Sequence, residues 1–186
     1  MTGGPPSGDY PTGGALYAPW RMGYIKGLSK PPGEQKCFLC EAAAVAANPA
    51  ATDADRRDKL VLWATEHSVV LLNRYPYANG HVLVAPIAHH ADLDLLDAAG
   101  QADLMVQTTA AVGLLRRAVS AQGFNVGINL GRCAGAGVPG HLHQHVVPRW
   151  AGDVNFMGVV GETQVVPEAL SRMWEELQRG RAEEGK

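Results

Sequence analysis

Short apolar segments bounded by turn residues predict β-strands through the middle and the second half of the chain. The clearest turns lie at positions 66–68 and 75–80, where Ser, Pro, Asn and Gly gather. The strands that this pattern predicts cover residues 60–65, 69–72, 81–87, 124–130 and 142–148.

Three other segments have helical character. Apolar residues recur every three or four positions over residues 101–121, which predicts a long helix that Gly123 closes. An Ala-rich segment predicts a short helix over residues 41–47, and a last helix is expected to open at Pro167, a favourable first helical residue. Strands interrupted by one long helix predict an α+β fold with an antiparallel sheet and a C-terminal helix.

The chain divides into three segments by composition. Residues 1–19 are rich in Gly and Pro and lack periodicity, so we expect a flexible N-terminal arm. Residues 20–178 carry every predicted element, and a chain of 186 residues is long enough for one domain with a buried core. Residues 179–186 are charged, and we expect a frayed tail there.

Composition and charge exclude several classes of function. Hydrophobic residues make up 46% of the chain and its formal net charge is −2, which is unlike a protein that coats nucleic acid. No apolar run approaches the ~20 residues that span a bilayer. The first twenty residues show no signal peptide, and three cysteines are too few for a disulfide scaffold. We therefore expect a cytoplasmic protein with no membrane and no nucleic-acid partner.

Three histidines occupy alternate positions, His141, His143 and His145, directly after a Gly-rich loop. On a strand they would lie on one face, about 6.6 to 7 Å apart. Close histidines are not all charged at neutral pH, so we expect one neutral nucleophile beside others that donate hydrogen bonds or bind a metal. Attack of a neutral imidazole on phosphorus gives a phosphoramidate, and loop N–H groups suit phosphate oxygens.

This motif, His141-Leu-His-Gln-His-Val-Val, resembles that of the histidine-triad (HIT) superfamily. The segment Asn79-Gly-His-Val-Leu-Val-Ala-Pro followed by His89 looks like the strand and helix start of that family, and the resemblance covers residues 37–150. The segments that begin at Leu16, Ala134 and Trp150 are similar to the diadenosine tetraphosphate phosphorylase-like branch. The resemblance implies a HIT-like fold.

The same resemblance implies a role for each residue of the site. The middle histidine, His143, would be the nucleophile on the α-phosphorus. His145 would contact the phosphate or the leaving group, and His141 would buttress the site. The implied nucleotide- and phosphate-binding residues are Asn73 at the ribose hydroxyls, Asn129 and Gly137 at phosphate oxygens, and Trp150 over the polyphosphate or the base.

Several of these residues have a simpler interpretation as well. Asn73 and Asn129 could each cap a turn, and Trp150 could pack in the core. Gln144 stands where many family members carry an apolar residue. In the related uridylyltransferases a Gln replaces the third histidine, so the presence of His145 argues against that activity.

The remaining polar residues of interest receive weaker interpretations. Arg132 and Arg149 are candidates for countering polyphosphate charge. Cys133 has no evident base and is interpreted as a small loop residue, while His67 and His81 have no identifiable partner and are interpreted as structural.

Cys37 and Cys40 form a CxxC pair, a spacing that lets two thiolates bind one ion. By resemblance to HIT proteins with this N-terminal pair, His89 and His141 would complete a structural zinc site, with His90 as the local competitor of His89. An unmetallated pair is the alternative.

The resemblance implies a nucleotidyltransferase that cleaves diadenosine tetraphosphate with inorganic phosphate to ATP and ADP through a nucleotidyl-histidine. The alternatives are a HIT hydrolase of dinucleoside polyphosphates or nucleoside phosphoramidates, a non-catalytic nucleotide-binding regulatory module, and a zinc-dependent hydrolase with the three histidines as ligands. The partners of the nucleotidyltransferase would be a dinucleoside polyphosphate and inorganic phosphate. The family also implies a homodimer with residues 101–121 near the interface, and pairing of dimers into a tetramer stays open.

Overall fold

A computed structural model describes residues 37–153 and 168–184, and its centre is one antiparallel sheet with the strand order β1-β2-β3-β5-β4. Every predicted strand is present, and no strand end is shifted by more than two residues. The strands are β1 (Val61–Ala64), β2 (Ser68–Leu72), β3 (Val82–Pro86), β4 (Gly123–Ile128) and β5 (Gln144–Arg149).

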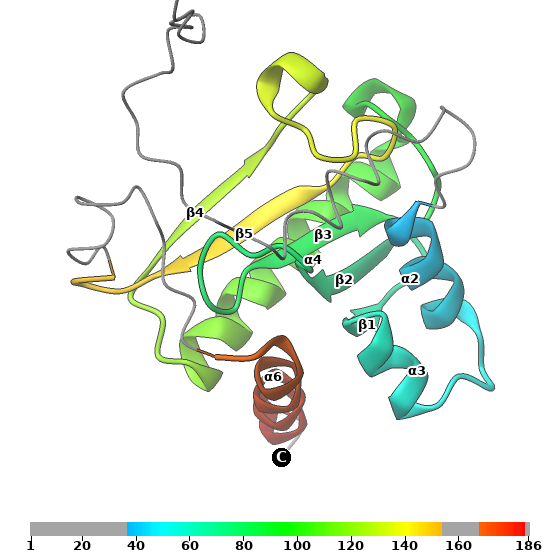
Figure 1. Cartoon of the computed structure of the whole chain (residues 1–186). Helices are drawn as coiled ribbons and strands as arrows, with labels where there is room; N and C mark the ends of the chain where they lie inside the picture. The colour runs from blue at the N-terminus through cyan, green and yellow to red at the C-terminus, as the bar shows by residue number, and fades with distance from the viewer. Residues whose placement is uncertain (1–36, 154–167, 185–186) are drawn as a thin grey trace, which may run out of the picture.

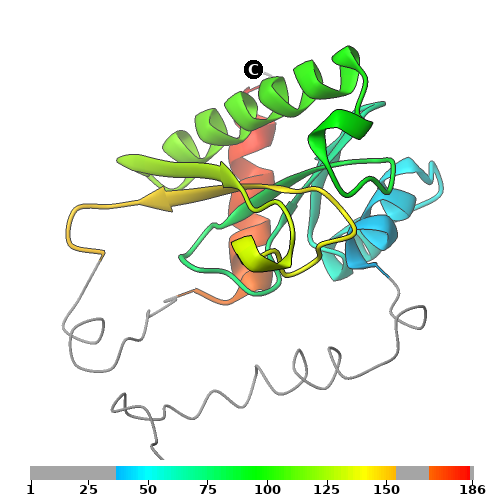
Figure 2. The ribbon, with the colours of Figure 1, turned by 90° about the horizontal axis from the view of Figure 1, so that it is seen from above.

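Helices cover both faces of the sheet (Figures 1 and 2). Helices α4 and α6 cover the face of the sheet from which Val70 and Val84 project. Helix α2 covers the other face, where it packs against Leu71 and Leu83. Alternate residues of β2 and β3 therefore point into two separate cores. The helices are α2 (Phe38–Ala47), α3 (Asp53–Asp58), η1 (Leu93–Leu95), α4 (Ala98–Ala118), η2 (Arg132–Ala134) and α6 (Leu170–Glu184).

Helix α2 begins at Phe38, three residues before its predicted start. Two further helices differ from the prediction for local reasons. Helix α4 begins three residues early because the carboxylate of Asp97 caps it, accepting a 2.8 Å hydrogen bond from the N–H of Gly100. Helix α3 was not predicted, although Thr52 and Asp55 form a capping box at its start.

The C-terminal helix continues further than the sequence suggested. Helix α6 extends through Glu184, so residues 179–184 of the expected tail are helical. Arg181 donates a 2.9 Å hydrogen bond to the carbonyl of Leu62 and lies over the ring of Trp63. These contacts hold the last helical turns against β1.

The expected N-terminal arm, the segment that begins at Leu16 and the helix start at Pro167 lie outside the described residues. In the part of the chain that the structure describes, no helix is long and apolar enough to cross a membrane.

Candidate active site and metal cluster

The three histidines of the motif do not share one strand. Strand β5 begins at Gln144, so only His145 belongs to it, and His141 and His143 lie in the extended segment just before it. The prediction that all three lie on a strand is therefore wrong. The reason is that β4 pairs with β5 only from Ile128 opposite Gln144, and the Gly-rich connection starts immediately beyond that pair.

His145 makes its main contact with a histidine from another strand end. The Nε2 of His81, which directly precedes β3, lies 2.9 Å from the Nδ1 of His145. His81 is completely buried. The interpretation of His81 as a residue without a partner is therefore wrong. Its partner lies 64 positions away and becomes a neighbour only because β3 pairs with β5.

One main-chain group fixes where the protons of this pair lie. The N–H of Tyr77 donates a 3.0 Å hydrogen bond to the Nδ1 of His81, which must therefore be unprotonated. The proton of His81 is then on Nε2 and is donated to the Nδ1 of His145. The proton of His145 is accordingly on Nε2, which is buried and has no partner among the described residues.

His143 has the complementary arrangement. Its Nδ1–H donates a 2.8 Å hydrogen bond to the carbonyl of His141, which leaves the lone pair on Nε2. The rings of His143 and His145 meet edge to face with their centroids 5.0 Å apart. The ring that carries a lone pair on Nε2 therefore lies next to the ring that carries an Nε2–H donor.

Burial keeps these three imidazoles neutral. It lowers the pKa of His81 to about 3, helped by the nearby His145 and His143, and lowers the pKa of His145 to about 4, helped by His143. The pKa of His143 is also lowered by burial, against the opposing effect of its bond to the carbonyl of His141. At neutral pH the site therefore offers an unprotonated imidazole nitrogen, which can act as a nucleophile.

The first histidine of the motif faces two thiols instead. His141 is completely buried, and its Nε2–H donates a 2.9 Å hydrogen bond to the carbonyl of Pro86, so the Nδ1 lone pair is free. This Nδ1 lies 3.3 Å from the Sγ of Cys37 and 3.4 Å from the Sγ of Cys40, and the Nδ1 of His89 lies 3.1 Å from the Sγ of Cys40.

These four side chains can hold a metal ion. Their ligand atoms all lie within 4.8 Å of one another. Tetrahedral zinc, with Zn–S of about 2.3 Å and Zn–N of about 2.0 Å, requires sulfur–nitrogen separations of roughly 3.5 Å, close to those observed. The hydrogen bond from His141 to the carbonyl of Pro86 is the kind of outer contact that orients a metal-bound imidazole.

The thiol of Cys40 is protonated at neutral pH when no metal is bound. Burial, together with the hydrogen bond and charge of the neighbouring Cys37, raises the pKa of Cys40 to about 11. A bound cation would displace the proton. Of the two adjacent histidines, His89 joins the cluster, whereas the main chain of His90 bonds to Ala88 and Leu142.

Of the other predicted binding residues, Asn73 contacts a histidine of the site, whereas Asn129 and Gly137 lie in a loop. Asn73 is buried, its side-chain oxygen accepts from the N–H of Tyr75, and its Nδ2 lies 3.3 Å from the Nδ1 of His81. It therefore shapes the turn before His81, as the capping interpretation expects. Asn129 and Gly137 lie in the loop between β4 and His141, and their phosphate roles stay predictions.

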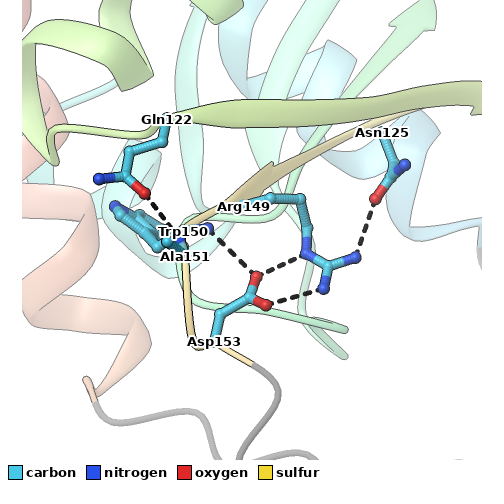
Figure 3. A network of polar contacts seen from close by, with 6 residues as sticks. All are labelled: Gln122, Asn125, Arg149, Trp150, Ala151 and Asp153. Carbon is cyan, nitrogen blue, oxygen red and sulfur yellow. Dashed lines mark hydrogen bonds and ion pairs between the residues drawn. The ribbon is translucent and has the colours of Figure 1, made fainter.

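Trp150 lies at the opposite end of β5 from the histidines. Its indole N–H donates a 3.1 Å hydrogen bond to the carbonyl of Val119, and its ring packs against the core, so its contacts support the packing alternative. Figure 3 shows Arg149 beside it, held by both carboxylate oxygens of Asp153 and by Asn125.

A protein-family comparison agrees with this geometry. The model of the HIT domain matches residues 55–152. The chain belongs to the HIT domain family. Its fold is that of a hypothetical histidine triad nucleotide-binding protein of Sulfolobus tokodaii, with a TM-score of 0.60 and 23% identity over 79% of this chain and 93% of that chain.

Two curated relatives of this HIT domain carry names that state an activity. It is 43% identical over 100 residues to an AP-4-A phosphorylase of Mycobacterium tuberculosis, covering 54% of this chain and 51% of that protein. It is 33% identical over 93 residues to an asymmetrical bis(5'-nucleosyl)-tetraphosphatase of Schizosaccharomyces pombe, covering 50% of each. The matches thus span about half the length of these relatives.

Proposed function

We propose that this protein is a nucleotidyltransferase that cleaves diadenosine tetraphosphate with inorganic phosphate, giving ATP and ADP. The observation that carries the proposal is the contact between the rings of His143 and His145. His143 keeps a free lone pair on Nε2, and the Nε2–H of His145 has no partner among the described residues. A neutral nucleophile beside a hydrogen-bond donor is what displacement at phosphorus requires.

The reaction has two balanced steps. In the first, the lone pair of His143 Nε2 forms a bond to the α-phosphorus, and the bond from that phosphorus to the bridging oxygen breaks. The departing oxygen takes the bonding electrons and is stabilised by the N–H of His145. In the second, an oxygen of inorganic phosphate attacks the same phosphorus, and the P–N electrons return to His143.

The partial match to an AP-4-A phosphorylase favours phosphate as the acceptor. The match to a tetraphosphatase favours water, which would make the protein a hydrolase of dinucleoside polyphosphates that yields ATP and AMP. Cleavage with phosphate and cleavage with water share the same first step, so these two reactions differ only in the acceptor.

The deciding experiment is product analysis. Purified protein is incubated with diadenosine tetraphosphate, with and without inorganic phosphate, and the nucleotides are separated by chromatography. We expect ATP and ADP only when phosphate is present. ATP and AMP in both buffers would overturn the phosphorylase and retain the nucleophile, and no turnover would favour a regulatory nucleotide-binding module.

We also infer that the cluster of Cys37, Cys40, His89 and His141 holds a structural zinc ion. The donor set and its spacing support this assignment. The ion would attach helix α2 to the segment that carries His143, and no reaction step involves it. Zinc analysis after exhaustive dialysis tests the assignment, with one ion per chain expected.

Pairing of two chains is supported by apolar residues that the described part of the molecule leaves exposed. Met105 and Val106 on α4 are each 60% exposed, and Val126 on the edge strand β4 is 46% exposed. Among the described strands β4 lies at the edge of the sheet, and an edge strand with an exposed apolar side chain suits two-fold association. Light scattering would give twice the mass of the chain for the dimer that we expect.

A further inference from the structure

The ring of Tyr77 packs against the rings of His81 and His145. The Nε2–H of His145 is the donor that has no partner among the described residues. The Tyr77 ring is nearly parallel to that of His145, at 19° with centroids 5.6 Å apart, and its centroid is 4.7 Å from that of His81. The ring therefore covers the hydrogen bond that joins these imidazoles. Although it packs on both rings, Tyr77 is 50% exposed, so it forms the solvent-facing cover of the pair.

The loop that carries Tyr77 is held at both ends. Asn73 accepts a 3.0 Å hydrogen bond from the N–H of Tyr75, and the N–H of His81 donates to the carbonyl of Ala78. Gly80 has a φ of 71°, and a Cβ there would lie 3.2 Å from the Cδ2 of Leu115, so only glycine suits this approach. Tyr77 is thus placed by main-chain contacts.

We propose that Tyr77 is a positioning residue for the leaving-group side of the reaction. Its ring holds the plane of His145 so that the Nε2–H of that imidazole points at the departing oxygen. Its main-chain N–H keeps the proton of His81 on the side that faces His145. This inference rests on the proposed function, because it requires His143 to attack phosphorus and His145 to serve the leaving oxygen.

The two contributions of Tyr77 are separable by substitution. A side-chain change removes the ring and leaves the main-chain N–H that fixes the proton of His81. Tyr77→Leu therefore tests the ring alone. Tyr77→Phe keeps the ring and removes only the hydroxyl. Tyr75→Leu, in the same loop and with 41% of the residue exposed, is the matched control.

Two aryl esters of adenosine 5'-phosphate provide the readout. Phenolate is a much stronger base than p-nitrophenolate, so departure of phenol depends far more on a hydrogen-bond donor. We expect Tyr77→Leu to lower kcat for the phenyl ester by about ten-fold, part of the 10²–10⁴ that a placed proton donor supplies, and for the p-nitrophenyl ester by about two-fold or less. Tyr77→Phe and Tyr75→Leu should leave the ratio of the two kcat values unchanged.

A double-mutant cycle shows whether the effect passes through His145. In the His145→Ala background, Tyr77→Leu should change kcat for the phenyl ester by less than about two-fold, because the group that it positions is absent. A full ten-fold loss in that background, or equal losses on both esters, would overturn the inference. A wild-type protein that cleaves neither the esters nor diadenosine tetraphosphate would overturn the proposed function itself, and this inference with it.

Discussion

His141 and His143 are two residues apart, yet they keep their lone pairs on different ring nitrogens. Each donates one ring N–H to a main-chain carbonyl, but His141 uses Nε2 toward Pro86 and His143 uses Nδ1 toward His141. The lone pair of His141 therefore faces two thiols, whereas that of His143 is on Nε2, in a ring that packs against His145. The comparison teaches that the carbonyl that each ring meets, and not the residue type, decides which ring nitrogen keeps its lone pair.

Removing the nucleophile should give the largest effect. We expect His143→Ala to lower kcat for diadenosine tetraphosphate by a factor on the order of 10⁴ or more, while zinc content stays unchanged. Initial rates with metal analysis on the same preparations check both. Residual activity within ten-fold of wild type would assign the nucleophile elsewhere.

Removing a thiol should affect folding more than chemistry. We expect Cys40→Ser to lose most of the zinc and to lower the thermal midpoint by several degrees, since metal binding stabilises the folded state. Differential scanning calorimetry with and without a chelator measures this. If wild-type protein contains little zinc and all three cysteines titrate freely, the metal assignment fails.

Acid should reveal the buried neutral histidines. An unfolded histidine takes up its proton near pH 6.5, whereas His145 and His81 in the fold do so at about pH 4 and 3. Their contribution to stability is thus complete above pH 6.5 and is lost as the pH falls toward 4 and 3. Unfolding at pH 5 should take up roughly one to two protons, and His81→Asn should reduce that uptake. Denaturant titrations at several pH values test this, and a pH-independent unfolding free energy between 6.5 and 4 would contradict it.

The smallest effect should come from the far end of β5. Trp150→Phe removes the hydrogen bond to Val119 and should cost about 1 kcal/mol of unfolding free energy with kcat within about two-fold of wild type. Chemical denaturation and rate measurements on one preparation separate the two quantities. A raised KM at unchanged stability would instead support the predicted role of Trp150 over the polyphosphate.

Local pattern was sufficient for most of the elements. The five strands and three of the helices follow from apolar spacing and turn residues, which act within a few positions of the chain. Helix α3 was missed because six polar and Ala residues show no apolar period, although the capping box at Thr52 was readable. The triad itself was recognisable because three alternate histidines are rare.

The sequence alone therefore determined the family, the five strands and most of the helices, and the residue types of the triad and the CxxC pair, because each depends on short-range pattern or on a motif. Tertiary structure decided the partners. It brought His81 to His145 through the pairing of β3 with β5, and His89 and His141 to the CxxC pair through the packing of α2. It also decided the proton positions, because a ring nitrogen takes its role from the carbonyl or N–H that it meets, and that group lies on a different part of the folded chain.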